Sequence, residues 1–287
     1  MVRRTIARTL ARKEWHCLSK HDQRKASAAM HSTTWASGAR DCNSATAAVT
    51  SADGASGCAS DAGPGAEMSA LEYDGVICDL DGTLVDTLED LADAVNRVLS
   101  AERAPVHSRA TYKLLVGKGI RDLVGQALPA EKRSDETIAR CYERVIADYG
   151  EHCLVKTHQY DGVAELVSGL RAAGAKLAVL SNKADELTRR IVTSLFRPAD
   201  FDVVMGAQPG LPLKPDPTVA LLVSARLGVA PSRMVFLGDS GIDMLTATAA
   251  GMIAVGAAWG FRTKDELVEN GASVVLDHPL ELLELRG

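Results

Sequence analysis

The chain has 287 residues, 46% of them hydrophobic and 24% charged, which is ordinary for a folded protein and sufficient for one large or two modest globular units. Its net charge of -5 excludes a nucleic-acid binder driven by overall charge, because affinity for a phosphate backbone requires clustered Lys and Arg. No apolar stretch approaches the ~20 residues of a membrane-spanning helix. We therefore expect neither nucleic acid nor membrane as a partner.

The cysteine content indicates a reducing compartment. The chain has six cysteines, and no two of them have the CxxC spacing of many zinc sites. A disulfide framework is not expected in a chain this long with so few cysteines. Cys78 lies in an apolar run and is expected to be a small buried hydrophobic residue. We therefore expect a cytoplasmic protein.

Residues 1–70 differ in composition from the rest. The segment 27–65 is rich in Ala, Ser, Gly and Thr without helical or strand periodicity, so we expect disorder there. The basic stretch at residues 3–13 is typical of a transit peptide, which would make the protein organellar. The alternative is an over-extended reading frame, because Met68 stands just before the first expected strand. Neither interpretation gives this segment a catalytic role.

From residue 71 onward, short apolar runs alternate with helical patterns. Strands are expected at residues 76–80, 176–180, 202–205, 234–237, 253–255 and 273–276. Helices are expected between most of them, at residues 164–173, 185–195 and 218–227. Short buried strands that alternate with helices indicate βα units around a parallel sheet.

Residues 88–155 interrupt this alternation. They contain no convincing strand, but helical patterns are present at residues 88–99, 110–128 and 134–149. An all-helical insertion between the first and second strands of an α/β sheet indicates a separate cap. We therefore predict an α/β fold: a Rossmann-like parallel core formed by residues 71–87 and 156–287, with a helical cap inserted after the first strand.

The strongest chemical signal follows the first expected strand, at residues 79–87 (DLDGTLVDT). Asp79 and Asp81 stand on a loop that leaves the carboxyl end of a strand, where open α/β sheets bind ligands. Gly82 and Thr83 suit a tight turn that offers backbone N–H groups to an anion. The alternative is an ordinary acidic loop with an Asx-turn.

Two further polar segments follow later strands. Ser181, Asn182 and Lys183 come after the run at 176–180, and their hydroxyl, amide and backbone donors suit phosphate oxygens. The alternative for them is a helix N-cap. Lys214 stands among prolines just before a helix. It would present a fixed positive charge to a phosphate, or it would be an ordinary solvated lysine.

The last segment, residues 238–243 (GDSGID), places two carboxylates at a strand end and a helix start. Asp239 and Asp243 make a hard-oxygen site suited to Mg²⁺. The alternative is that Asp239 caps the helix.

In this order, the four segments resemble the motifs of the haloacid dehalogenase-like superfamily. Residues 79–83 are similar to its DxDGT first motif, and Ser181 to its small hydroxyl second motif. Lys214 is similar to the third-motif lysine, and residues 238–243 to the GDxxxD fourth motif. The resemblance covers residue 72 to the C-terminus, and the helical insertion is similar to the cap of the phosphoglycolate phosphatase and β-phosphoglucomutase subgroup.

The resemblance implies a Mg²⁺-dependent phosphatase. Asp79 would attack phosphorus and become an aspartyl phosphate, while Asp81 would protonate the leaving alkoxide and then deprotonate the attacking water. Mg²⁺ would be held by the Asp79 carboxylate, the Asp81 backbone carbonyl and Asp239, and Asp243 would support the metal directly or through water.

The transferring phosphoryl group is expected to be neutralised by positive charge and hydrogen-bond donors. The residues implied for this are Lys214, Ser181 and loop amides around Gly82, with Thr83 and Asn182 as further substrate-binding residues.

Other activities of the superfamily fit less well. Its dehalogenases lack an acid two residues after the nucleophile, so Asp81 favours phosphoryl transfer. A β-phosphoglucomutase-like isomerase shares every core motif, but its close relatives usually carry a His or bulky residue where this chain has residues 88–91 (LEDL). A mere binding module would be expected to have lost Asp79 or Asp239, and both are present.

Substrate selection is expected to lie in the cap. Residues 116–120 (VGKGI) resemble the Gly-rich cap turn of the subgroup. Lys118 and Arg121 would supply a cation for the carboxylate of 2-phosphoglycolate or another small phosphorylated acid; the alternative is that both are solvated surface charges. Sugar phosphates, nucleoside monophosphates and pyrophosphate remain competing substrates. We expect a monomer or a homodimer.

Overall fold

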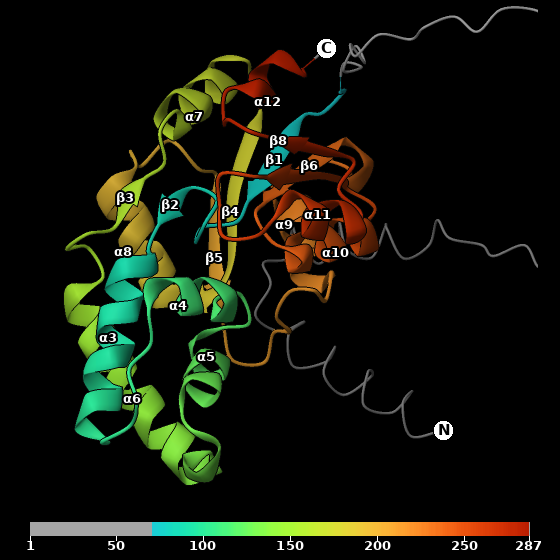
Figure 1. The fold of residues 1–287 in the computed structure, drawn as a ribbon. Coiled ribbons are helices and arrows are strands. Elements are labelled where there is room, and N and C mark those ends of the chain that lie inside the picture. The colour runs from blue at the N-terminus through green and yellow to red at the C-terminus, as the bar shows by residue number, and fades with distance from the viewer. Residues whose placement is uncertain (1–70, 287) are drawn as a thin grey trace, which may run out of the picture. The chain divides into compact units, whose positions relative to one another are not determined.

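The computed structural model describes residues 71–286, so the expectations for residues 1–70 lie outside the described residues. Its centre is a six-stranded sheet in the order β5-β4-β1-β6-β7-β8, and every neighbouring pair is parallel. The strands are β1 (Gly75–Cys78), β4 (Lys176–Ala184), β5 (Val203–Ala207), β6 (Met234–Gly238), β7 (Ile253–Ala257) and β8 (Val274–Leu276). The predicted parallel α/β fold is confirmed (Figure 1).

The strand order changes direction at β1. Cys78, the last residue of β1, lies opposite Val179 of β4 on one side and Leu237 of β6 on the other. The chain therefore leaves β1 between two connections that run in opposite directions, which is where open α/β sheets form a ligand crevice. Asp79 is the first residue beyond this point.

Helices cover both faces of the sheet, which explains why its strands are apolar throughout. Within β1, Val76 and Cys78 belong to one buried cluster and Ile77 to the other. The first cluster contains side chains of α7 (Val163–Ala172), α8 (Asp185–Leu195) and α12 (Glu281–Glu284). The second contains side chains of α9 (Thr218–Leu227), α10 (Gly241–Ala250) and α11 (Lys264–Glu269). Successive strand residues point to opposite faces, so both faces are buried.

A helical segment stands between two very short strands, β2 (Val85–Asp86) and β3 (His158–Gln159), which pair antiparallel. Its helices are α3 (Leu88–Ala101), α4 (Arg109–Leu115), α5 (Ile120–Ala127) and α6 (Asp135–His152), with a 3₁₀ turn at Ala130–Lys132. They gather away from the sheet in Figure 1. The sequence did not reveal β2 and β3, because a two-residue strand is too short to establish a period.

The expected helix at 110–128 is in fact two helices. The backbone is extended at Val116, and φ is +133° at Gly117 and +90° at Gly119. A right-handed helix cannot continue through these angles, so α4 and α5 are separated by a turn. This turn reaches the sheet and lines the site described below.

The buried carboxylate of Asp90 joins the two ends of the helical segment. It lies in the first turn of α3 and accepts hydrogen bonds from the Lys156 and Thr157 amides and from the Thr157 hydroxyl, at 2.9–3.0 Å. These hydrogen bonds tie the start of the helical segment to the chain that leaves it.

The three cysteines within residues 71–286, Cys78, Cys141 and Cys153, are free and buried. None of the helices in this part of the chain combines the length and the apolarity needed to cross a bilayer.

Candidate active site

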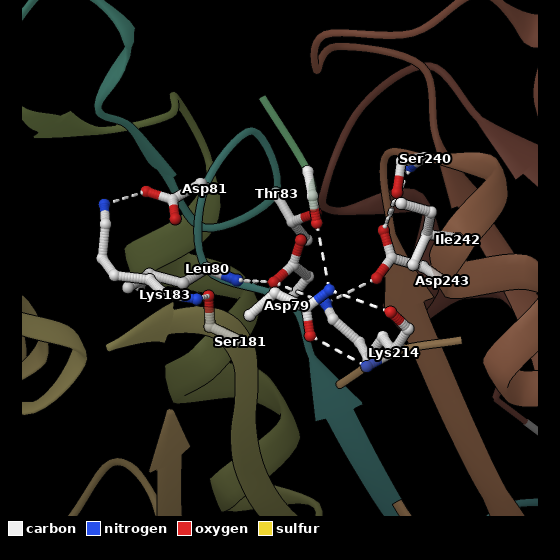
Figure 2. A network of polar contacts seen from close by, with 12 residues as sticks. Asp79, Leu80, Asp81, Thr83, Ser181, Lys183, Lys214, Ser240, Ile242 and Asp243 are labelled. Carbon is white, nitrogen blue, oxygen red and sulfur yellow. Dashed lines mark hydrogen bonds and ion pairs between the residues drawn. The ribbon is translucent and has the colours of Figure 1, made fainter. Parts of the chain in front are cut away.

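A cavity opens where β1, β4 and β6 end. Its sheet side is polar, and its helical side is apolar. The sheet side includes Asp79, Asp81, Ser181, Asn182, Lys183, Lys214 and Asp239. The helical side includes Leu91, Val116, Gly117, Gly119, Ile120 and Leu123. The structure thus brings together the polar segments that lie far apart in the sequence (Figure 2).

Asp79 lies at the centre of the polar side. Its Oδ1 accepts a hydrogen bond from the Leu80 amide at 2.7 Å and is 2.8 Å from the Lys214 ammonium. Its second oxygen, Oδ2, accepts no hydrogen bond from any residue within 71–286. One oxygen of this carboxylate is therefore fixed, and the other is open to a ligand.

Lys214 is a buried cation held between two acids. Its ammonium is 2.8 Å from Asp79 Oδ1 and 2.7 Å from Asp243 Oδ1, and its side chain is 4% exposed. Burial alone would lower the pKa of Lys214, but the two carboxylates outweigh it and raise the pKa above its usual value. The residue is a fixed positive charge, so the alternative of a solvated lysine is wrong.

Asp239 is packed against two glycines. A Cβ at Gly82 would lie 2.3 Å from Asp239 Oδ2, and a Cβ at Gly260 would lie 2.3 Å from Asp239 Cβ. Gly82 also has a φ of +89°. The carboxylate accepts hydrogen bonds from the Thr83 hydroxyl at 3.3 Å and the Phe261 amide at 2.8 Å. Only glycine permits this close approach.

The geometry assigns Gly82 and Thr83 to the support of Asp239. The Gly82 amide donates to the Val85 carbonyl at 2.9 Å, so this amide is not free to bind phosphate as the sequence suggested. The Thr83 side chain is fully buried, and its hydroxyl is directed to Asp239. Both residues shape the turn that closes the site.

Asp243 anchors the start of α10. Its Oδ2 accepts hydrogen bonds from the Ser240 amide at 3.1 Å and the Ser240 hydroxyl at 2.6 Å. The bond from the Ser240 amide is one half of a capping box between Ser240 and Asp243. Its Oδ1 faces Lys214. The helix cap is therefore Ser240, and the alternative that Asp239 caps this helix is wrong.

The site carries more negative than positive charge. Asp79, Asp239 and Asp243 each have a carboxylate oxygen that lies within 4.8 Å of those of the other two. Burial, opposed in part by Lys214 and reinforced by Asp243, raises the pKa of Asp79 to about 7. Burial and the neighbouring Asp243 and Asp79 charges raise the pKa of Asp239 well above its usual value. These carboxylates are the hard oxygen donors that fit a divalent cation such as Mg²⁺.

Asp81 lies apart from the other acids (Figure 2). Its Oδ1 forms an ion pair with Lys183 and accepts a hydrogen bond from the Thr87 hydroxyl. Lys183 in turn donates to the Tyr149 hydroxyl, from α6, at 2.9 Å. The sequence analysis named Lys183 only as part of the polar segment 181–183, without a role for its side chain, and it did not name Tyr149. The position of Lys183 directly after Ser181 and Asn182 could have indicated a site residue. Nothing in the sequence around Tyr149 indicates one.

Ser181 and Asn182 lie within β4, which extends four residues further than expected. The α8 N-cap is Ala184, so the N-cap alternative is wrong for both. The Ser181 hydroxyl accepts a hydrogen bond from the Lys183 amide at 3.2 Å, and its own hydrogen is available to a ligand.

The Asn182 side chain connects three segments. Its Nδ2 donates to the carbonyls of Gly117 and Lys214 at 3.0 and 3.1 Å, and its Oδ1 accepts from the Lys214 amide at 2.9 Å. Asn182 therefore holds the Lys214 loop and the turn between α4 and α5 in place.

Lys118 and Arg121 are not brought to this cavity. Both are exposed, and neither is among the residues that line it. The cation that faces the helical side is Arg262, from the loop after β7. Its guanidinium donates to the carbonyls of Lys113, Leu114 and Val116 at the end of α4, the last of these at 2.6 Å.

Comparison with known proteins places this geometry in a family. Residues 76–257 match the haloacid dehalogenase-like hydrolase family. The chain is 32% identical to a phosphoglycolate phosphatase of Colwellia psychrerythraea, covering 75% of this chain and 98% of that protein. It is 29% identical to an N-acetylmuramic acid 6-phosphate phosphatase of Pseudomonas aeruginosa, covering 76% of this chain and 96% of that protein.

The fold has solved relatives as well. A predicted phosphoglycolate phosphatase from Haemophilus somnus superposes with a TM-score of 0.69 at 27% identity, covering 74% of this chain and 97% of that one. Relatives of this similarity match almost over their full length. The chain is therefore an enzyme of the haloacid dehalogenase-like hydrolase family.

Proposed function

We propose that the protein is a Mg²⁺-dependent phosphatase that forms an aspartyl phosphate on Asp79. The observation that carries this proposal is the orientation of the Asp79 carboxyl, with Oδ1 held by Leu80 and Lys214 and Oδ2 open. A buried carboxylate with one free oxygen is suited to nucleophilic attack on phosphorus. Oδ2 would form the new bond to phosphorus as the bond to the ester oxygen breaks.

Positive charge must offset the repulsion between this carboxylate and a phosphate dianion. Lys214 supplies one fixed charge, which Asp243 keeps in place. Asp79, Asp239 and the backbone carbonyl of Asp81 would hold Mg²⁺, whose charge neutralises the phosphate oxygens. Asp243 supports this set indirectly, because both its oxygens are engaged by Lys214 and Ser240.

Asp81 is the group suited to proton transfer. In the first half-reaction its carboxyl would give a proton to the leaving alkoxide. In the second it would take a proton from the water that attacks the aspartyl phosphate. The Ser181 hydroxyl would donate to a phosphate oxygen.

We propose 2-phosphoglycolate, or another small phosphorylated acid, as the preferred substrate. Phosphoglycolate phosphatases are among the relatives that match the chain almost over their full length. The helical wall of the cavity is apolar and built around two glycines, so it would exclude water from a small substrate. The N-acetylmuramic acid 6-phosphate phosphatase among the relatives makes a larger phosphorylated acid the main competitor.

A substrate panel tests the proposal. Purified protein with a fixed Mg²⁺ concentration would be assayed for kcat/KM on 2-phosphoglycolate, N-acetylmuramic acid 6-phosphate, sugar phosphates, nucleoside monophosphates and pyrophosphate. We expect 2-phosphoglycolate to lead. A competitor whose kcat/KM is ten times that of 2-phosphoglycolate would overturn the proposed substrate, but the proposed phosphatase activity would stand. Interconversion of β-glucose 1-phosphate and glucose 6-phosphate without net release of phosphate would instead establish an isomerase.

A further inference from the structure

Two buried groups at the site have no part in the mechanism proposed above. Lys183 lies near the end of β4 with a side chain that is 2% exposed, and Tyr149 is fully buried in α6. The Lys183 ammonium donates to the Tyr149 hydroxyl at 2.9 Å and lies 4.9 Å from the centre of its ring. Burying an ammonium ion is costly unless it is paired and hydrogen-bonded. Such an arrangement therefore calls for a role.

The protonation states of this pair are clear. Burial would lower the pKa of Lys183, but the Asp81 carboxylate and the Tyr149 oxygen raise it above its usual value. Burial raises the pKa of Tyr149 to about 12, although Lys183 opposes the shift. Lys183 is thus a cation and Tyr149 a neutral phenol near neutral pH.

The partner of Lys183 is the acid expected to move protons. Asp81 Oδ1 accepts hydrogen bonds from both Lys183 and the Thr87 hydroxyl. No residue within 71–286 donates to its Oδ2. Two donors therefore fix the carboxyl through one oxygen and leave the other for the ester oxygen or for water.

The support of this carboxyl reaches into the helical segment. Tyr149 lies in the last turn of α6, and the neighbouring Gly150 carbonyl accepts a hydrogen bond from Arg190 of α8. Asp81 follows β1, and Lys183 belongs to β4. Tyr149 is thus the point at which α6 contacts this set of hydrogen bonds, while Thr87, the N-cap of α3, contacts Asp81 directly.

Resting on the proposed phosphatase function, we propose that Lys183 is the positioning residue of Asp81 and that Tyr149 makes this positioning depend on the docking of the helical segment. In this proposal Lys183 would act on the Asp81 carboxyl and not directly on phosphorus or the ester oxygen. It sets where the Asp81 carboxyl lies, and α6 sets where Lys183 lies.

The proposal predicts that the variants will be sensitive to the leaving group. A misplaced Asp81 cannot protonate an alkoxide, so hydrolysis of an alkyl phosphate should slow. The 4-nitrophenolate ion leaves without a proton, so formation of the aspartyl phosphate from 4-nitrophenyl phosphate should be far less affected. A general loss of folding or of metal would slow both esters alike.

The experiment measures the pre-steady-state rate of leaving-group release from 2-phosphoglycolate and from 4-nitrophenyl phosphate, both with Mg²⁺. Tyr149→Phe removes only the hydroxyl, and Lys183→Met removes the charge while keeping a long side chain. We expect Lys183→Met to slow the alkyl ester at least ~10-fold more than the aryl ester, which is a fraction of the ~100- to 10,000-fold that general acid–base catalysis contributes. Tyr149→Phe should act in the same direction with a smaller ratio, and Lys183→Arg should recover part of the loss.

Tyr112→Phe is the matched control. Tyr112 is also a fully buried tyrosine of the helical segment, but its hydroxyl donates to Asn96 at 2.7 Å, away from the cavity. It should leave the ratio between the two esters unchanged. If Lys183→Met does not fold, the test rests on Tyr149→Phe, through the ratio of its rate losses on the alkyl and aryl esters.

Equal losses on both esters in Tyr149→Phe and Lys183→Met would overturn the positioning role while the phosphatase stands. A wild-type protein that releases neither leaving group, nor phosphate from any other ester of the panel, would overturn the proposed function instead.

Discussion

The two walls of the cavity differ in chemistry and in origin. The sheet wall carries Asp79, Asp81, Lys214 and Asp239, all in segments that follow parallel strands. The helical wall contributes aliphatic side chains and glycines. Even the cation that faces it, Arg262, comes from a loop after β7. Under the proposed function, the sheet would supply the bond-breaking chemistry and the helical segment would supply shape and exclusion of water.

This contrast makes a graded prediction. Changes on the sheet wall should remove turnover for every substrate, because they act on the phosphoryl group that all substrates share. Changes on the helical wall should alter which substrate is preferred.

The largest effect is expected at the nucleophile. Asp79→Asn should keep the fold and lower kcat at least ~1,000-fold on every phosphate ester, because an amide cannot form the acyl phosphate. Steady-state kinetics would measure the loss, and circular dichroism would verify the fold. Asp93→Asn is the control: Asp93, in α3, is 44% exposed, pairs with Lys156 and does not line the cavity, so this variant should retain full activity. More than about a tenth of wild-type kcat in Asp79→Asn would place the nucleophile elsewhere.

Removal of the metal should have the next largest effect. EDTA should abolish activity on all substrates and Mg²⁺ should restore it, whereas Ca²⁺ should inhibit because it prefers more ligands and looser geometry. Full turnover in EDTA would show that the acidic cluster serves another purpose.

The same cluster makes stability depend on pH. Burial raises the pKa of Asp79 from 3.8 to about 7, so the folded metal-free protein binds more protons than the unfolded chain between these values. Stability should therefore fall as pH rises from about 4 to about 7. Mg²⁺ requires ionised carboxylates, so it should raise Tm by at least ~4 °C more at pH 8 than at pH 5. An equal Mg²⁺ shift at both values would contradict this linkage.

A smaller effect should distinguish the two candidate cations of the helical side. Arg262 lines the cavity and holds the end of α4, whereas Lys118 is exposed. Arg262→Ala should lower kcat/KM for 2-phosphoglycolate about 10-fold or more, the usual cost of losing hydrogen bonds from a charged group. Lys118→Ala should change it less than about twofold, as for most surface substitutions. The reverse order would support the sequence-based expectation that Lys118 binds the substrate carboxylate.

The smallest effect is expected for removal of residues 1–67. The acids, the lysines and the apolar wall of the cavity described above all lie within residues 71–286, so we expect a chain that begins at Met68 to match the full chain in kcat/KM and in Tm. A large loss of kcat/KM after truncation would give the removed segment a part in the site.

Sequence reasoning was accurate where a residue's role depends on its neighbours in the chain. The strand alternation predicted the parallel sheet, and the polar segments that follow its strands predicted the grouping of Asp79, Lys214 and Asp239. It was least accurate for Gly82, whose amide is used within its own turn, and for Lys118. It also missed the break between α4 and α5, because apolar periodicity continues across Gly117 and Gly119 while the backbone does not.

The sequence by itself determined the α/β fold, because the hydrophobic period of each element is a local property. It also determined which acids and which lysine follow the strands, and a parallel sheet brings such segments together at one edge. Only the tertiary structure decided which donors serve each carboxylate. Lys214 is held by Asp243 and Lys183 by Asp81 and Tyr149, across elements distant in the chain. Such pairings depend on the angles at which helices and strands pack, and no spacing in the sequence encodes them.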